Sequence, residues 1–78
     1  MLKATVIVKL KEGIDDPEGK SIKHSLNLLG FESVKEVRVS KYYEILIDGE
    51  SESVVEDIIH KLLVNPVIHE YEVRVERV

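Results

Sequence analysis

Apolar and polar residues alternate at the start of the chain, where every second residue from Leu2 to Leu10 is apolar. A period of two residues predicts a β-strand with one buried face. The same alternation returns over residues 34–48 and again over 71–76. Residues 34–48 are long for one strand and carry the polar pair Ser40-Lys41 near the middle. We interpret them as two strands joined by a tight hairpin, with one long bent strand as the alternative.

Two amphipathic helices separate these strands. Asp16-Pro17 predicts a helix start, because Asp caps the free N–H groups and Pro suits the first helical position. Gly30 predicts its end. The second helix is expected to start at Ser53, which has capping-box spacing to a glutamate, and to stop at Asn65-Pro66. The apolar positions spaced for one helix face are Ile22, Leu26 and Leu29 in the first helix and Val55, Ile58, Ile59 and Leu62 in the second.

The resulting order, β-α-β-β-α-β, predicts one α+β domain over residues 1–78. We expect a ferredoxin-like two-layer sandwich, in which two helices cover one face of a four-stranded antiparallel sheet. The residues expected to face the helices are Val6, Val8, Val37, Val39, Ile45, Ile47, Val73 and Val75.

The opposite face of this sheet would be bare, with two aliphatic residues, Ile7 and Leu46, on its central strands among charges of both signs. An apolar centre with a polar rim is typical of interfaces. A chain of 78 residues without cysteine has a small core and no disulfide. We therefore expect a homodimer or larger assembly that uses Ile7 and Leu46, although two scattered surface aliphatics would be the simpler interpretation.

No pattern predicts catalysis or a bound cofactor. The histidines have no zinc-ligand spacing, and no glycine-rich phosphate loop or serine nucleophile motif is present. Asp15, Asp16 and Glu18 cluster, but a helix cap explains them better than a metal does. The net charge is −4, acidic and basic residues are interspersed along the chain, and the apolar runs are short. These features argue against nucleic-acid binding and a membrane span, and they suit a cytoplasmic protein.

Several segments, in order and over essentially the whole chain, resemble the PurS family, the small subunits of phosphoribosylformylglycinamidine synthase. The segments are Leu10-Lys11-Glu12 with Asp16-Pro17-Glu18-Gly19, Leu29-Gly30-Phe31, Val37-Arg38-Val39-Ser40-Lys41-Tyr42-Tyr43-Glu44-Ile45, and Lys61-Leu62-Leu63-Val64-Asn65-Pro66-Val67-Ile68 with Tyr71. Two positions depart from the family pattern: Ser40 stands where the hairpin usually has glycine, and His69 where glutamate is common.

The resemblance implies a non-catalytic adaptor that bridges a glutaminase subunit (PurQ) and a synthetase subunit (PurL) for ammonia transfer in de novo purine biosynthesis. ATP and Mg²⁺ would then be bound by the synthetase, and this chain would hold no cofactor. On the matching positions we expect Arg38, Lys41 and Tyr42 to contact a partner, as well as the Asn65-Pro66 loop. A solvated turn explains the first three equally well. The alternative function is a dimeric small-molecule-sensing domain of the same fold.

Overall fold

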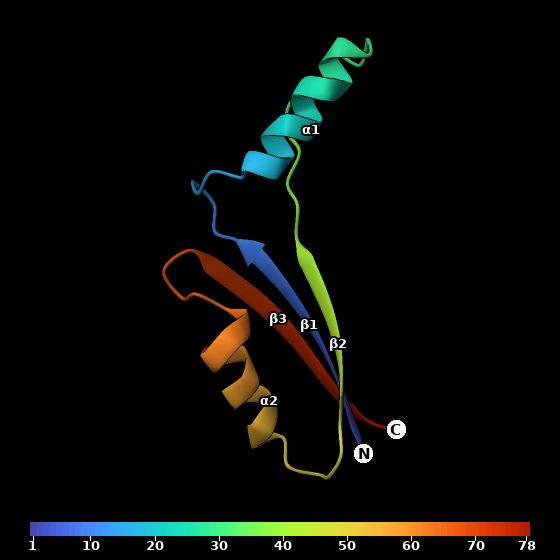
Figure 1. Ribbon diagram of the computed structural model, residues 1–78, viewed down its shortest axis with the longest axis vertical. Helices are drawn as coiled ribbons and strands as arrows, with labels where there is room; N and C mark the ends of the chain where they lie inside the picture. Colours follow the sequence, from blue (N-terminus) through green and yellow to red (C-terminus); the bar gives the residue numbers. More distant parts are fainter.

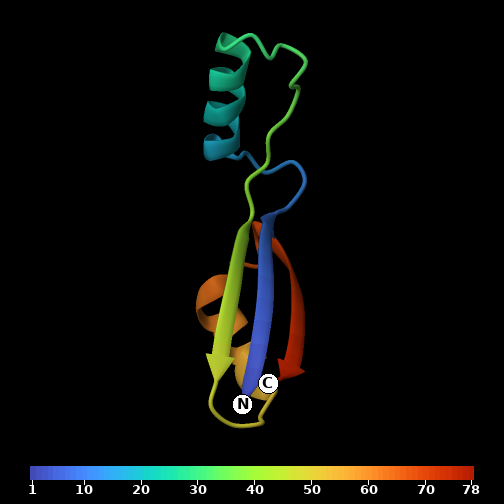
Figure 2. The ribbon, with the colours of Figure 1, turned by 90° about the vertical axis from the view of Figure 1, so that its right-hand side faces the viewer.

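The computed structural model describes residues 1–78 and falls into two parts, which we call the body (residues 1–10 and 41–78) and the arm (residues 11–40). In chain order the elements are β1 (Leu2–Leu10), α1 (Pro17–Leu28), β2 (Lys41–Ile47), α2 (Ser53–Ile58), the π-helix η1 (Ile59–Leu63) and β3 (His69–Arg77). The arm continues the long axis of the molecule past one end of the sheet (Figures 1 and 2). The radius of gyration is consequently 16.3 Å, against about 12 Å for a compact domain of this length.

The body is built around β1, which lies between β2 and β3 and pairs antiparallel with both. The predicted alternation of this strand is confirmed, since Leu2, Ala4, Val6 and Val8 are buried and the residues between them are half-buried. Val6 lies opposite Tyr43 on one side and Val73 on the other. One face of the sheet therefore forms the core.

The predicted four-stranded ferredoxin-like sheet is wrong, because the sheet has three strands. Residues 34–40 are not a strand: they approach β2 without a ladder partner, and the chain then enters β2 directly. No hairpin forms at Ser40-Lys41, and no residue other than glycine has a positive φ. The alternative of one long strand is closer to the structure. β2 is therefore an edge strand, and Leu46 does not lie on a central one as predicted.

The helix α1 forms as predicted but does not cover the sheet (Figure 2). Asp16 is its N-cap, with Pro17 in the first turn. At the other end the Gly30 amide donates to the Asn27 carbonyl and the Phe31 amide to that of Leu26. This pair of bonds is a Schellman motif, for which Gly30 supplies the positive φ of 100°. The expected layer of two helices over one sheet face is thus reduced to α2 and η1.

The segment α2–η1 covers the sheet, but the residues that it turns toward the sheet differ in part from those expected. Val55 and Ile59 are buried as predicted, whereas Leu62 is 82% exposed. The reason is the π-helical turn: the Val64 amide donates to the Ile59 carbonyl five residues earlier, so Val64 takes the inward place. The predicted capping box is also wrong, because Glu52 is the N-cap and the Ser53 hydroxyl bonds to Ser51.

Candidate partner-binding surfaces

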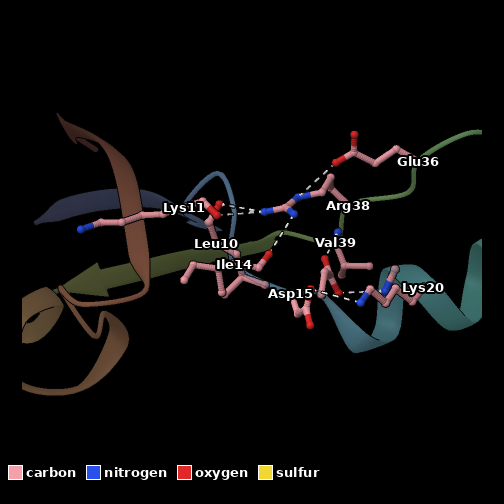
Figure 3. Close-up of polar contacts among 10 residues, drawn as sticks. Leu10, Lys11, Ile14, Asp15, Lys20, Glu36, Arg38 and Val39 are labelled. Carbon is pink, nitrogen blue, oxygen red and sulfur yellow. Dashed lines mark hydrogen bonds and ion pairs between the residues drawn. The ribbon is translucent and has the colours of Figure 1, made fainter.

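Arg38 holds the arm to the end of the body. Its guanidinium donates to the carbonyl oxygens of Ile14 (3.0 Å), Leu10 (3.2 Å) and Lys11 (3.2 Å), as Figure 3 shows. The Glu36 carboxylate lies 3.8 Å from its Nε. These bonds engage much of the donor fork that a partner carboxylate would use. A partner contact by Arg38 remains a prediction, and the side chain has a structural role within its own chain.

Asp16 makes the second link at the junction of the arm and the body, which we call the neck. Here the start of α1 meets the returning segment, residues 34–40. Its buried carboxylate accepts from the amides of Gly19 (2.8 Å) and Val39 (2.7 Å), so it caps α1 and fastens the returning segment with one group. The bond from Val39, then the one from Gly19, holds the pKa of the Asp16 carboxyl below its ordinary value, against the opposing effect of desolvation. Asp16 is therefore a structural carboxylate, which agrees with the cap predicted in place of a metal ligand.

Gly19 explains how α1 and the returning segment approach so closely. A Cβ at this position would overlap the carbonyl oxygen of Val37. The residue is buried, and any side chain would force the two segments apart.

Lys41 and Tyr42 begin β2 and point to opposite faces of the sheet, because neighbouring strand residues alternate. The side chain of Lys41 is exposed and forms no ion pair or hydrogen bond. Tyr42 is 60% exposed, and its hydroxyl donates to Glu44 at 3.2 Å. The structure therefore does not gather Arg38, Lys41 and Tyr42 into one cluster, but it leaves the last two accessible.

The Asn65-Pro66 loop is exposed and internally bonded. The Asn65 side-chain oxygen accepts from the Val67 amide at 3.0 Å, and the backbone amide of Asn65 donates to Nδ1 of His69 at 2.9 Å. Lys11 donates to the Pro66 carbonyl at 2.7 Å, which ties this loop to the start of the arm. The loop is shaped by these contacts before any partner arrives.

Two apolar side chains near this loop were missed by the sequence interpretation. Leu62 is 82% exposed and Val67 is 75% exposed. Leu62 was assigned to the buried stripe, and only the π-helical turn places it outside. Val67 follows a proline in a loop, where no periodicity exists to indicate burial or exposure.

The bare face of the sheet carries Ile7 and Leu46, as expected, but not side by side. Ile7 lies opposite Tyr42, and Leu46 lies opposite Lys3. Tyr42 and Leu46 are four positions apart along β2, or about 13 Å. Ion pairs occupy the surface around them, from Lys9 to Glu72 (3.1 Å) and from Lys3 to Glu44 (4.0 Å). An interface through this face stays a prediction.

A polar cluster of a carboxylate, a histidine and a tyrosine links the helix layer to β3. Glu56 accepts from the Tyr71 hydroxyl at 3.3 Å, and His60 Nε2 lies 3.2 Å from the same carboxylate oxygen. The His60 ring meets that of Tyr71 edge-on at 5.9 Å. Burial, then the charge of Glu56 and this hydrogen bond, raises the pKa of the Tyr71 phenol above its ordinary value. No nucleophile lies among these groups, so the cluster serves as a tie between elements.

Elsewhere in the structure, no three side chains of the metal-ligating kinds converge on a common point. None of the helices combines the length and hydrophobicity that crossing a membrane requires.

Comparison with known proteins gives one consistent family. The family model described as PurS, phosphoribosylformylglycinamidine (FGAM) synthase, matches residues 3–77. The subunit PurS of phosphoribosylformylglycinamidine synthase from Methanocaldococcus jannaschii is 51% identical, over 100% of this chain and 99% of the relative. The subunit PurS from Bacillus subtilis is 38% identical, over 100% of this chain and 96% of the relative.

Solved structures agree with these matches. The crystal structure of M. jannaschii PurS has a TM-score of 0.81 and covers 100% of this chain and 99% of its own. B. subtilis PurS has a TM-score of 0.87 at 36% identity, over 99% and 100% of the two chains. A chain in the structure of PurLQS from Thermotoga maritima has a TM-score of 0.76 at 31% identity, over 97% of this chain and 99% of that one.

Proposed function

Because the chain belongs to the PurS family of phosphoribosylformylglycinamidine synthase subunits, we propose that it is the non-catalytic subunit that joins glutaminase and synthetase in this enzyme. The glutaminase (PurQ) would release ammonia from glutamine. The synthetase (PurL), which would bind ATP and Mg²⁺, would add the ammonia to formylglycinamide ribonucleotide. This reaction belongs to de novo purine biosynthesis, so we also infer a cytoplasmic location.

The observation that carries this proposal is the likeness to a chain of the T. maritima PurLQS structure over nearly the full length of both chains. The form of the molecule supports it. Large hydrophobic side chains are exposed on both the arm and the body, among them Leu29, Phe31, Leu62 and Val67, and the polar groups serve to hold elements together. A bridging subunit needs accessible contact surfaces more than it needs a pocket.

For the contact with glutaminase or synthetase we propose Lys41 and Tyr42 at the start of β2, with Arg38, and the Asn65-Pro66 loop. Lys41 supports this best, because it is a free cation that can pair with a partner carboxylate. Leu62 and Val67 add exposed apolar area near the loop. Apolar side chains beside polar groups are a common composition for protein–protein contacts.

We also propose that the chain acts as a homodimer or larger assembly. The earlier expectation placed Ile7 and Leu46 at this contact. The separation of these two residues along the sheet weakens that choice of surface, but not the expectation of an oligomer, which rests on the small core.

Reconstitution from purified subunits tests the adaptor role. Glutamine-dependent formation of formylglycinamidine ribonucleotide by the glutaminase and synthetase should require this chain, and the chain alone should catalyse nothing. Turnover by the isolated chain, or full activity without it, would overturn the proposal.

Lys41→Glu tests the contact within that assembly. It should weaken capture of the other two subunits by at least about fivefold, as expected for a residue worth more than about 1 kcal/mol. Lys35→Glu is the control, because Lys35 is also exposed, lies in no ion pair and receives the same charge change. Equal capture by both variants would remove Lys41 from the contact.

A further inference from the structure

The step Asp48-Gly49 lies at an open bend of the chain between β2 and α2. Asp48, Gly49 and Glu50 are all exposed, and they follow directly on Ile47, the last residue of β2. Gly49 has a positive φ of 120°, and a Cβ built at this position would meet nothing within 4 Å. Glycine adopts this conformation without strain and carries no side chain that could shield its own nitrogen. The peptide bond between the two residues is therefore accessible and little hindered.

Two reactive groups at this bend are held by no other part of the chain. The carboxylate of Asp48 forms no hydrogen bond and no ion pair. The backbone amide of Gly49, which lies outside every helix and strand, donates to no acceptor. A free carboxyl group thus lies beside a free amide nitrogen, and the two can react with each other.

Every other aspartate and asparagine of the chain lacks this combination. Two of them precede proline, which has no N–H with which to react. Two lie within a helix, where the next amide belongs to the helical backbone. The fifth is paired with Lys20 at 3.1 Å and precedes a buried residue. In this order the residues are Asp16 and Asn65, Asn27 and Asp57, and Asp15.

We propose that Asp48-Gly49 is a site of spontaneous aspartate isomerisation. The Gly49 nitrogen attacks Cγ of the Asp48 side chain in its protonated carboxyl form. The new N–C bond closes a succinimide ring, and the carboxyl hydroxyl leaves with the amide proton as one molecule of water. Water then opens the ring at the main-chain carbonyl of Asp48, which becomes a free carboxylate. The main chain now runs through the former side-chain carbon, and the product, isoaspartate, has the same mass as the original chain.

The neighbouring residue gives this change a structural consequence. Glu50 contacts both ends of the chain: its Oε1 lies 3.5 Å from the Met1 ammonium group and its Oε2 lies 3.0 Å from Nε of Arg77. Isoaspartate adds one carbon to the main chain, a bond of about 1.5 Å. Because Ile47 is fixed opposite Leu2 in the sheet, residues 48–52 must take up the extra length. Glu50 consequently moves away from both chain ends.

The effect is confined to the ends of the outer and central strands. Both ion pairs of Glu50 are exposed, and exposed pairs contribute little to stability. The buried core is formed by other residues, such as Val6 and Ile59, which lie away from this bend in the sequence. Isomerisation therefore loosens the chain ends and leaves the fold intact.

Peptide mapping of the full-length protein tests the site. The purified chain is incubated at physiological temperature and neutral pH and then digested with trypsin. One peptide, residues 42–61, contains both Asp48 and Asp57, so it carries the site and an internal control. Electron-transfer dissociation distinguishes isoaspartate from aspartate at each position, and a sample digested without incubation corrects for changes during digestion. Isoaspartate should accumulate at position 48 and not at position 57. Its absence at position 48, or equal amounts at both positions, would overturn the proposal.

Two substitutions test the chemistry of the step. Asp48→Glu keeps the charge but would have to close a larger ring, so the isomerised product should be lost. Asp48→Asn keeps the shape, and its neutral amide reacts with loss of ammonia in place of water, so isoaspartate should accumulate faster than in the wild type. Product that persists in Asp48→Glu would contradict the succinimide route.

Hydrogen exchange tests the release of Glu50. Chemical synthesis of the 78-residue chain with isoaspartate at position 48 provides a homogeneous sample. The amide of Val78, which donates to the Met1 carbonyl at 3.1 Å, should exchange faster than in the unmodified chain, while the amides at the centre of β1 should not change. Glu50→Gln, which removes both ion pairs without lengthening the chain, is the matched control and should show the same faster exchange. Unchanged exchange at Val78 in the isoaspartyl chain would contradict the release of Glu50.

Discussion

The body and the arm are stabilised in different ways, although one continuous chain forms both. The body contains every buried apolar side chain, from Leu2 on β1 to Val64 after η1. The arm buries only Asp16 and Gly19, a carboxylate that binds amides and a glycine that lets two segments touch. The comparison teaches that the body is held by its own hydrophobic core. The arm is positioned by hydrogen bonds and leaves its apolar stripe for another surface.

The largest expected effect lies in the body. Ile59→Ala removes a fully buried side chain from the core and should lower the free energy of unfolding by about 2–5 kcal/mol, measured by urea denaturation. Leu62→Ala, three residues away but 82% exposed, should stay within about 0.5 kcal/mol of wild type. Equal losses in the two variants would contradict the π-helical register that distinguishes them.

Gly19→Ala tests the neck. The new methyl group overlaps the Val37 carbonyl, and such overpacking should cost about 1–3 kcal/mol of unfolding free energy despite the better helix propensity of alanine. Ser21→Ala, at an exposed position in the same helix, is the matched control and should be neutral or slightly stabilising. A stable Gly19→Ala protein would show that α1 and the returning segment are not in contact.

The stability of the protein should depend on pH through Asp16 at the neck. The pKa of Asp16 is lowered in the folded protein, so its contribution to the free energy of unfolding is complete above the unfolded pKa of about 3.9. This contribution is lost as the pH falls through the lower pKa of the folded state. Asp16→Asn should therefore be less stable than wild type near pH 7, and the difference should shrink below about pH 4. Asp15→Asn, which loses only a surface pair with Lys20, is the control in denaturation at each pH. A pH-independent difference would contradict the assignment of Asp16.

The smallest effect belongs to the tie between the helix layer and β3. Tyr71→Phe removes one exposed hydrogen bond to Glu56 and should cost less than about 1 kcal/mol. Glu56→Gln should bring the pKa of the Tyr71 phenol down toward its ordinary value, read by ultraviolet absorbance titration, because it removes a nearby negative charge. An unchanged titration would place the cause in burial alone.

Periodicity predicted the elements better than their arrangement. The strand at Leu2–Leu10, the cap at Asp16 and the helix end at Gly30 all follow from local chemistry, and the structure confirms them. The predicted strand before Ser40-Lys41 is wrong, because the alternation at Val37 and Val39 indicates an extended chain but does not identify the strand with which it pairs. The same pattern suits pairing within the chain or with a second copy.

The candidate surfaces show a similar limit. Leu62 was misplaced because a helical stripe assumes 3.6 residues per turn, and one π-helical turn moves the inward position to Val64. Arg38 was singled out as a partner contact, which stays a prediction, and no sequence pattern predicted that backbone carbonyls of its own chain would surround it. Contacts between distant segments depend on topology, which local patterns do not determine.

Hydrogen exchange at two protein concentrations tests the difference between the arm and the body most directly. If a second copy covers α1, the backbone amides of residues 18–28 should become more protected as the concentration rises through the dimer dissociation constant, while β1 should keep the same strong protection at both concentrations. Protection of α1 that is equally high at every concentration, down to the monomer, would show that the arm needs no partner.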